Sequence, residues 1–297
     1  MKTTHLARKI LFIALVVWGS VSLAPLTEAA PKKLLVVTIT KGFRHSSIPT
    51  AEKVLGELGE KSGAFTVEYA RVEPNDPQFK GADGKSDTNK VNAAIEKVLA
   101  AKMSPVALKN YDGVIFANTT GDLPLPDKPA FLNWIKSGKA FIGMHSATDT
   151  FGGHTPLDPY VEMIGGEFKH HGDQAEVDCI NQDHQHPACR DLGATWRLKD
   201  EIYLLNGFER SKVHGLLTLD KHPNDKTPGD YPIAWCKEYG KGRVFYTSLG
   251  HREDVWDPNT PANFKRENPK EVSEAYQKHI LGGIKWALGL EKGSAKP

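Results

Sequence analysis

Short apolar runs alternate with amphipathic helical segments along most of this chain. Residues 33–40 (KLLVVTIT) form the first run, an expected helix follows at 51–58, and residues 65–70 form the next run. Strands that are buried on both faces of a parallel sheet carry nearly continuous aliphatic and β-branched residues of this kind. The repeated order of strand, loop, helix and strand therefore predicts an α/β fold with a doubly wound, mostly parallel sheet.

The middle of the chain has a different pattern, because strand-like segments follow one another there without helices between them. These segments are expected at 174–180, 196–208, 213–220 and 231–236. They predict a strand-rich insertion between about residues 170 and 235 of one domain that spans residues 30–290. A helix at 270–288 closes the domain, and the tail at 291–297 (EKGSAKP) is expected to be disordered.

The first 29 residues have the layout of a secretory signal peptide. Basic residues precede an apolar run at 10–23, and Thr27-Glu28-Ala29 places small residues before the expected cut after Ala29. This predicts a secreted or periplasmic protein with no membrane attachment after cleavage. The alternative is an uncleaved anchor helix, but the apolar run is short for a membrane span.

The charge of the mature chain argues against a nucleic-acid partner. Three of the 38 basic residues and one of the 36 acidic residues lie in segment 1–29, so 35 of each remain. The sequence has no basic patch or charge block, which leaves a small molecule as the expected partner and does not fix an oligomeric state. In an oxidising compartment Cys179 and Cys189 could form a disulfide, whereas Cys236 reads as a buried thiol.

Three histidines occupy equivalent positions, each just after an expected strand. His45 follows the run at 33–40, His145 follows 140–144, and His251 follows 243–248. The carboxyl ends of parallel strands meet at one edge of a sheet, where α/β proteins bind their ligands. Imidazoles that converge there with an acidic group can form a metal site or an acid/base pair. The alternative is that each histidine only caps a strand end with a hydrogen bond.

Other polar residues could join this edge. One histidine of the pair in FKHHG should point inward, with His171 the candidate, and Glu201 is a candidate carboxylate at the start of an apolar strand. Asp149 has an equal claim because it lies close to His145, and Arg44 shares the loop of His45. The metal candidates are His45, His145, His171 and His251, and the catalytic candidates are His145, His251 and Glu201.

The segment GMHSA has the form of a nucleophile elbow, a strained turn from strand to helix that exposes its central side chain. Its centre is His145, so acylation on serine or cysteine is not expected, and Ser146 lies one position away from the apex. The sequence has no GxGxxG and no GxxxxGK[ST] run. No nucleotide cofactor is therefore expected.

The chain resembles the trehalose-utilisation (ThuA-like) family in a series of ordered motifs. They are GFRH, GMHSATDTF, YVEMIGGEFKHH, DEIYLL, YGKGRVFYTSLGH and the final WALG. The resemblance runs through essentially the whole mature chain. It implies a flavodoxin-like fold similar to class I glutamine amidotransferases, in which the elbow carries a catalytic cysteine. Because His145 stands at that position here, glutaminase activity is not expected.

The resemblance also implies a role in the metabolism of disaccharides or 3-keto glycosides, with a divalent ion (Zn, Mn or Mg) as the expected cofactor. A base such as His145 or His251 could then remove the hydrogen next to the keto group while the ion, held by the other histidines and Glu201, polarises the carbonyl. Such an enzyme would be a hydrolase, lyase or isomerase. Phe43, Phe151 and Trp256 are candidates for stacking on the sugar, together with Arg44 and Asp149 as further substrate contacts.

Two alternatives remain open at the level of sequence. The first is a non-catalytic carbohydrate-binding or accessory protein of the periplasm. The second is a metal site that only stabilises the fold.

Overall fold

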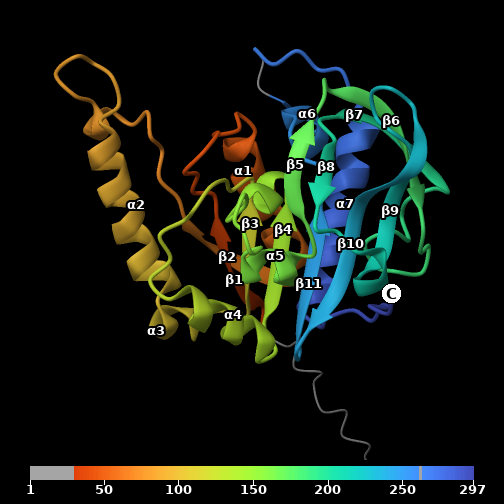
Figure 1. Cartoon of the computed structure of the whole chain (residues 1–297), viewed down its shortest axis with the longest axis horizontal. Helices are drawn as coiled ribbons and strands as arrows, with labels where there is room; N and C mark the ends of the chain where they lie inside the picture. The colour runs from red at the N-terminus through yellow and green to blue at the C-terminus, as the bar shows by residue number, and fades with distance from the viewer. Residues whose placement is uncertain (1–29, 261–262) are drawn as a thin grey trace, which may run out of the picture. The chain divides into compact units, whose positions relative to one another are not determined.

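A nine-stranded sheet forms the centre of the computed structural model, which describes residues 30–260 and 263–297 (Figure 1). The expected signal peptide at 1–29 lies outside the described residues. The strand order is β2-β1-β3-β4-β11-β10-β9-β6-β7. The first five strands in this order are parallel: β2 (Phe65–Ala70), β1 (Lys32–Val37), β3 (Gly113–Ala117), β4 (Ala140–Met144) and β11 (Gly242–Thr247).

The strand-rich segment is inserted between the neighbouring parallel strands β4 and β11, and most of it extends the same sheet. Its four long strands pair antiparallel beyond β11: β10 (Pro228–Tyr239), β9 (His214–Lys221), β6 (Ala175–Asn181) and β7 (Thr195–Asp200). Two short strands, β5 (Glu167–His171) and β8 (Tyr203–Asn206), pair with each other in a second sheet. The fold is therefore mixed α/β, with a parallel half and an antiparallel half in one large sheet.

Helices cover both faces of the parallel half, because alternate strand residues point to opposite sides. In β1, Leu34 and Val36 join one core and Leu35 and Val37 join the other. The first core also contains residues of α1 (Ile48–Ser62), α6 (Glu253–Trp256) and α7 (Lys270–Ala287). The second contains residues of α2 (Thr88–Met103), α3 (Pro105–Leu108), α4 (Lys128–Lys136) and α5 (Pro159–Ile164). Among the described residues no helix is both long and apolar enough to cross a bilayer.

The last helix approaches the sheet very closely. A Cβ atom at Gly283 of α7 would lie 2.4 Å from the Phe245 ring of β11, and one at Gly282 would lie 2.0 Å from the Pro187 carbonyl oxygen. Real Cβ contacts are never that short, so only glycine allows this approach. The contact holds β11, and hence the loop that carries His251, against α7.

The expectation that Cys236 is a buried thiol is confirmed, whereas the disulfide considered for the other two cysteines is not formed. Cys179, Cys189 and Cys236 are all buried free thiols, so the structure contains no Cys179–Cys189 disulfide. The tail at 291–297 is held by hydrogen bonds rather than disordered. The Cys236 thiol donates to the Ser294 carbonyl oxygen at 3.4 Å, and the Trp286 indole donates to that of Gly293 at 3.1 Å.

The stability of the fold is expected to fall in acid because of His279 in α7. Its Nδ1–H donates to the Ala188 carbonyl oxygen at 2.8 Å. Burial lowers the pKa of this histidine from 6.5 to about 4. The unfolded chain would therefore take up a proton near pH 6.5, but the folded chain would not until about pH 4. The stability that depends on neutral His279 is present at pH 7 and is lost as the pH falls through this window.

We expect His279→Gln, which cannot titrate, to reduce the acid destabilisation of the wild type by about 3 kcal/mol between pH 7 and pH 4. Urea unfolding of both proteins at the two pH values measures this difference. Equal losses of stability in the two proteins would contradict it.

Candidate metal centre

His145 lies at the centre of a buried polar cluster. It is the first residue after β4 and begins the 3-10 turn η2 (His145–Asp149), where its φ of 47° is in the left-handed region. Such backbone strain in a residue other than glycine is typical of functional sites. Its Nδ1–H donates to the Ser248 carbonyl oxygen at 2.9 Å. This bond leaves the lone pair of the neutral ring on Nε2, which faces the cluster.

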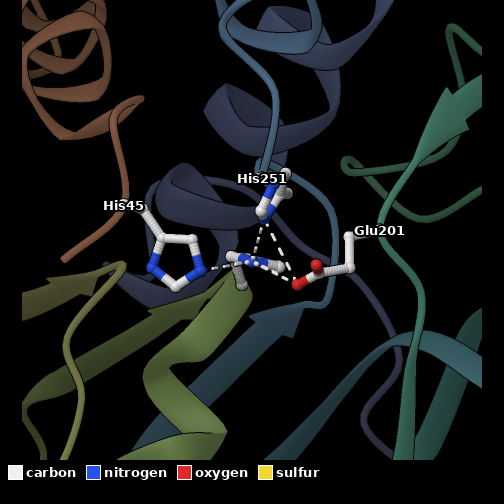
Figure 2. Close-up of side chains that lie close together, drawn as sticks. His45, Glu201 and His251 are labelled. Atoms are coloured by element: carbon white, nitrogen blue, oxygen red, sulfur yellow. Dashed lines mark hydrogen bonds and ion pairs between the residues drawn. The ribbon is translucent and has the colours of Figure 1, made fainter. Parts of the chain in front are cut away.

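Two more histidines direct ring nitrogens at that lone pair (Figure 2). His45 Nε2 lies 3.2 Å from His145 Nε2, and His251 Nδ1 lies 3.3 Å from the same atom. The other nitrogen of His45, Nδ1, lies 3.4 Å from Ser146 Oγ, which can accept its N–H. An outer hydrogen bond of this kind fixes the tautomer that leaves the inner nitrogen free to bind a ligand.

Glu201 supplies the carboxylate of the cluster. Its Oε1 lies 3.2 Å from His251 Nδ1 and 3.6 Å from His145 Nε2. Its Oε2 lies 3.2 Å from Nδ1 of His171, at the end of β5. The glutamate follows β7, so the antiparallel half of the sheet completes a site that the parallel half begins.

Asp200, the residue before Glu201, positions two of these groups. It is fully buried, and its Oδ2 accepts the Gly250 N–H at 2.7 Å while its Oδ1 accepts the Arg252 N–H at 3.2 Å. These bonds hold the backbone on both sides of His251. Burial raises the pKa of Asp200 to about 6, although the backbone N–H groups act in the opposite direction. The sequence pattern pointed to Glu201 alone and gave Asp200 no role.

The donor set fits a divalent metal ion. One ligand atom each from His45, His145, Glu201 and His251 lies within 4.8 Å of all the others. Four ligands at zinc-like distances around a tetrahedral ion are roughly 3.4 Å apart. His145 Nε2 lies 3.2, 3.3 and 3.6 Å from the nearest atoms of His45, His251 and Glu201, and His251 Nδ1 lies 3.2 Å from Glu201 Oε1. Three imidazoles favour zinc over magnesium, which prefers oxygen ligands.

Electrostatics keep two of the three histidines neutral, as metal ligation requires. Burial, together with the neighbouring His251, lowers the pKa of His45 to about 4. Burial and the other two histidines also lower the pKa of His145. Burial acts in the same direction on His251, but its hydrogen bond to Glu201 and the charge of Asp200 outweigh it and raise that pKa.

A cavity of about 220 Å³ opens onto the cluster. Phe43, which is 67% exposed, stands at its rim, and the Tyr203 ring packs 4.5 Å from the His145 ring. The paired strands β5 and β8 supply a wall of the cavity through Phe168, His171 and Tyr203. The remaining lining residues are His45, Asp149, Glu201 and His251. A larger cavity of about 670 Å³, beside α2, contains none of the four cluster residues.

The structure brings most of the expected site residues together. His45, His145, Glu201 and His251 converge, His171 contacts Glu201, and both Phe43 and Asp149 line the cavity.

Three expected substrate contacts lie elsewhere. Arg44 points into the larger cavity and pairs with Glu73 at 2.8 Å. Phe151 and Trp256 are buried in the two cores, where Phe151 packs on Tyr160 and the Trp256 indole donates to the Gly250 carbonyl oxygen. Their rings have no open face for a sugar, so these two assignments are corrected.

Fold and site together define a mixed α/β protein with a three-histidine, one-carboxylate cluster where the parallel strands end. The sequence profile of the ThuA family, described as trehalose utilisation, matches residues 33–287. The chain therefore belongs to the ThuA family.

Solved structures share the fold. A ThuA-like protein from Parabacteroides merdae is similar at 20% identity with a TM-score of 0.61, over 90% of this chain and 93% of that one. A ThuA-like protein from Bacteroides uniformis is similar at 17% identity with a TM-score of 0.57, over 90% and 96% of the two chains. No protein of curated function matches the chain.

Proposed function

We propose that this ThuA-family protein is a metal-dependent enzyme that cleaves or rearranges a 3-keto glycoside. The observation that carries the proposal is the convergence of three imidazole nitrogens and one carboxylate oxygen beside a small cavity that His45, Glu201 and His251 line. Purely structural sites are normally closed to solvent, whereas catalytic sites keep a position open to water or substrate. The cavity that opens onto this cluster favours the catalytic class over the structural one.

The ion would be held by His45, His145, His251 and Glu201. A divalent ion there would polarise the keto oxygen of the substrate and stabilise the negative charge that develops on it. His145 then serves as a ligand and not as the base, because both of its ring nitrogens are engaged. Outer partners orient the histidine ligands through hydrogen bonds to the Ser248 carbonyl oxygen and to Ser146 Oγ. His171 Nδ1 lies 3.2 Å from the second carboxylate oxygen of Glu201.

The size of the cavity supports a small reacting group. Its volume of about 220 Å³ is below the roughly 300–1,000 Å³ of pockets that enclose a drug-sized ligand. One sugar ring would therefore enter, and the rest of the glycoside would remain outside. The exposed ring of Phe43 at the rim offers an apolar face for stacking.

The wider setting of the enzyme is also a proposal. We propose that the parallel half is wound as in flavodoxin-like proteins, because its order β2-β1-β3-β4-β11 follows the 2-1-3-4-5 order of that class. The signal-like segment at 1–29 supports export to the periplasm or beyond. Histidine at the elbow, in place of cysteine, supports the absence of glutaminase activity.

Purified protein is expected to retain about one divalent ion per chain and to release product from methyl 3-keto-glucoside but not from methyl glucoside. Only the keto sugar has a hydrogen acidified by a neighbouring carbonyl. Elemental analysis and product detection by NMR measure the two quantities, and a chelator followed by Zn, Mn or Mg tests their connection. Binding of the keto sugar without product under all three metals would reject the enzyme and favour a binding protein.

A further inference from the structure

One acidic side chain of the cavity has no hydrogen-bond partner among the residues that the structure describes. Asp149 ends the turn that begins with His145, and it lines the cavity together with His45, His171 and Glu201. Its main chain is fixed, since the Asp149 carbonyl oxygen accepts the Gly121 N–H at 2.8 Å. Its carboxylate, by contrast, forms no hydrogen bond or ion pair with any residue between 30 and 260 or between 263 and 297. A half-buried carboxylate at a cavity wall has lost part of its hydration and is free to bind a ligand that enters the cavity.

The surroundings of Asp149 suit proton transfer. Burial and the nearby charge of Glu167 raise its pKa to about 6. Other titratable groups whose charges interact with it are the phenols of Tyr203 and Tyr246. A carboxyl group with a pKa near neutrality exchanges protons efficiently at physiological pH.

The other titratable groups of the site are already engaged. The inner nitrogens of His45, His145 and His251 face one another, and Glu201 lies among them. His171 Nδ1 lies 2.9 Å from the Gly172 carbonyl oxygen and 3.2 Å from Glu201 Oε2. An enzyme that removes a proton from carbon needs a further group that faces the substrate and is not a ligand.

We propose that Asp149 is the catalytic base that removes the proton on the carbon between the keto group and the anomeric carbon of a 3-keto glycoside. This inference rests on the proposed function. The carboxylate takes the proton, and the electron pair of the C–H bond forms a double bond to the anomeric carbon. The bond from that carbon to the glycosidic oxygen breaks, and the leaving oxygen takes a proton from water. The hydroxide that remains takes the proton from Asp149, which restores both the water and the carboxylate. The products are an unsaturated keto sugar and an alcohol, so atoms and charges balance without an oxidant.

Asp149→Asn tests the assignment, because it keeps the size of the side chain and removes its basicity. With methyl 3-keto-glucoside in D₂O, we expect both solvent exchange of that hydrogen and release of methanol to fall about 10²–10⁴-fold. Metal content per chain and calorimetric affinity for the sugar should stay near the wild-type values, because Asp149 is not one of the four candidate ligands. The matched control is Asp122→Asn, an exposed acid paired with His154, which should keep wild-type exchange and turnover.

The outcomes separate the two proposals. Exchange by Asp149→Asn within about threefold of the wild-type rate would overturn the role of Asp149 and leave the metal enzyme standing. Loss of the ion in this variant would reassign Asp149 as a ligand and overturn its role as a base. A wild-type protein that holds the ion but gives neither exchange nor product would reject the proposed function, and the inference with it.

Discussion

Replacing His145 with alanine is expected to remove the bound ion and to lower turnover by about 10³-fold or more, while the chain stays folded. Its Nε2 is the atom that both His45 and His251 approach, at 3.2 and 3.3 Å. Removing this donor should cost more than the roughly 10–100-fold loss of metal affinity that follows mutation of an outer partner. Elemental analysis, turnover of methyl 3-keto-glucoside and circular dichroism measure the three quantities.

A second substitution protects this test against a folding defect. Glu201→Gln preserves the size of the side chain and can still hydrogen-bond to His251, but it removes the negative charge. It should also lose most of the ion and most of the turnover. If either variant kept both the ion and wild-type turnover, that residue would not be a ligand of a catalytic metal. If both lost the ion and kept turnover, the metal would be structural.

The largest loss of stability is expected for Asp254→Ala, at about 3–5 kcal/mol. Asp254 is fully buried and accepts Arg252 Nε–H at 2.9 Å and Nη2–H at 3.1 Å. It also accepts the main-chain N–H groups of Glu267 and Asn268. Alanine would remove the carboxylate that pairs with the buried guanidinium of Arg252, which would keep only its bonds to Gln174 Oε1 and the Lys265 carbonyl oxygen. It would also leave the two main-chain N–H groups without this acceptor. Urea unfolding at neutral pH measures the change.

An exposed ion pair provides the control for this prediction. Glu176 accepts from Arg197 at 2.9 Å, and both side chains are more than half exposed. Glu176→Ala should therefore cost much less stability than Asp254→Ala, because water and salt screen an exposed ion pair. Equal losses in the two variants would show that Asp254 is not a buried anchor. Since Arg252 follows His251, Asp254→Ala is also expected to weaken metal binding.

Much of the parallel half could be predicted from the sequence, because its strands are apolar on both faces and lie between clear turns. The same pattern located His45, His145 and His251 at strand ends, and the structure brings all three together. Periodicity identifies a buried strand, and parallel pairing then decides where its last residue lies. The ThuA family assignment from short ordered motifs is likewise confirmed by the match over 33–287.

The features that were missed depend on contacts between distant segments. β10 pairs with β11 and so extends the main sheet. Hydrophobic periodicity shows that a segment is a strand, but it does not show which other strand it will pair with. The role of Asp200 depends on main-chain N–H groups some fifty residues away. Trp256 follows a histidine of the site closely in sequence, but its ring turns into the core. Closeness along the chain did not predict the direction of that side chain.

Because Glu201 follows an edge strand of the sheet, binding of a metal ion depends on that strand staying paired. The three histidines belong to the parallel half, whereas Glu201 follows β7, the outermost strand of the antiparallel half. Fraying of that outer strand would carry the carboxylate away from the histidines. An ion that binds only the closed arrangement disfavours such fraying by mass action, by about 4 kcal/mol at a free concentration 1,000 times the Kd. Release of the ion and opening of this edge would then be two views of one local unfolding equilibrium.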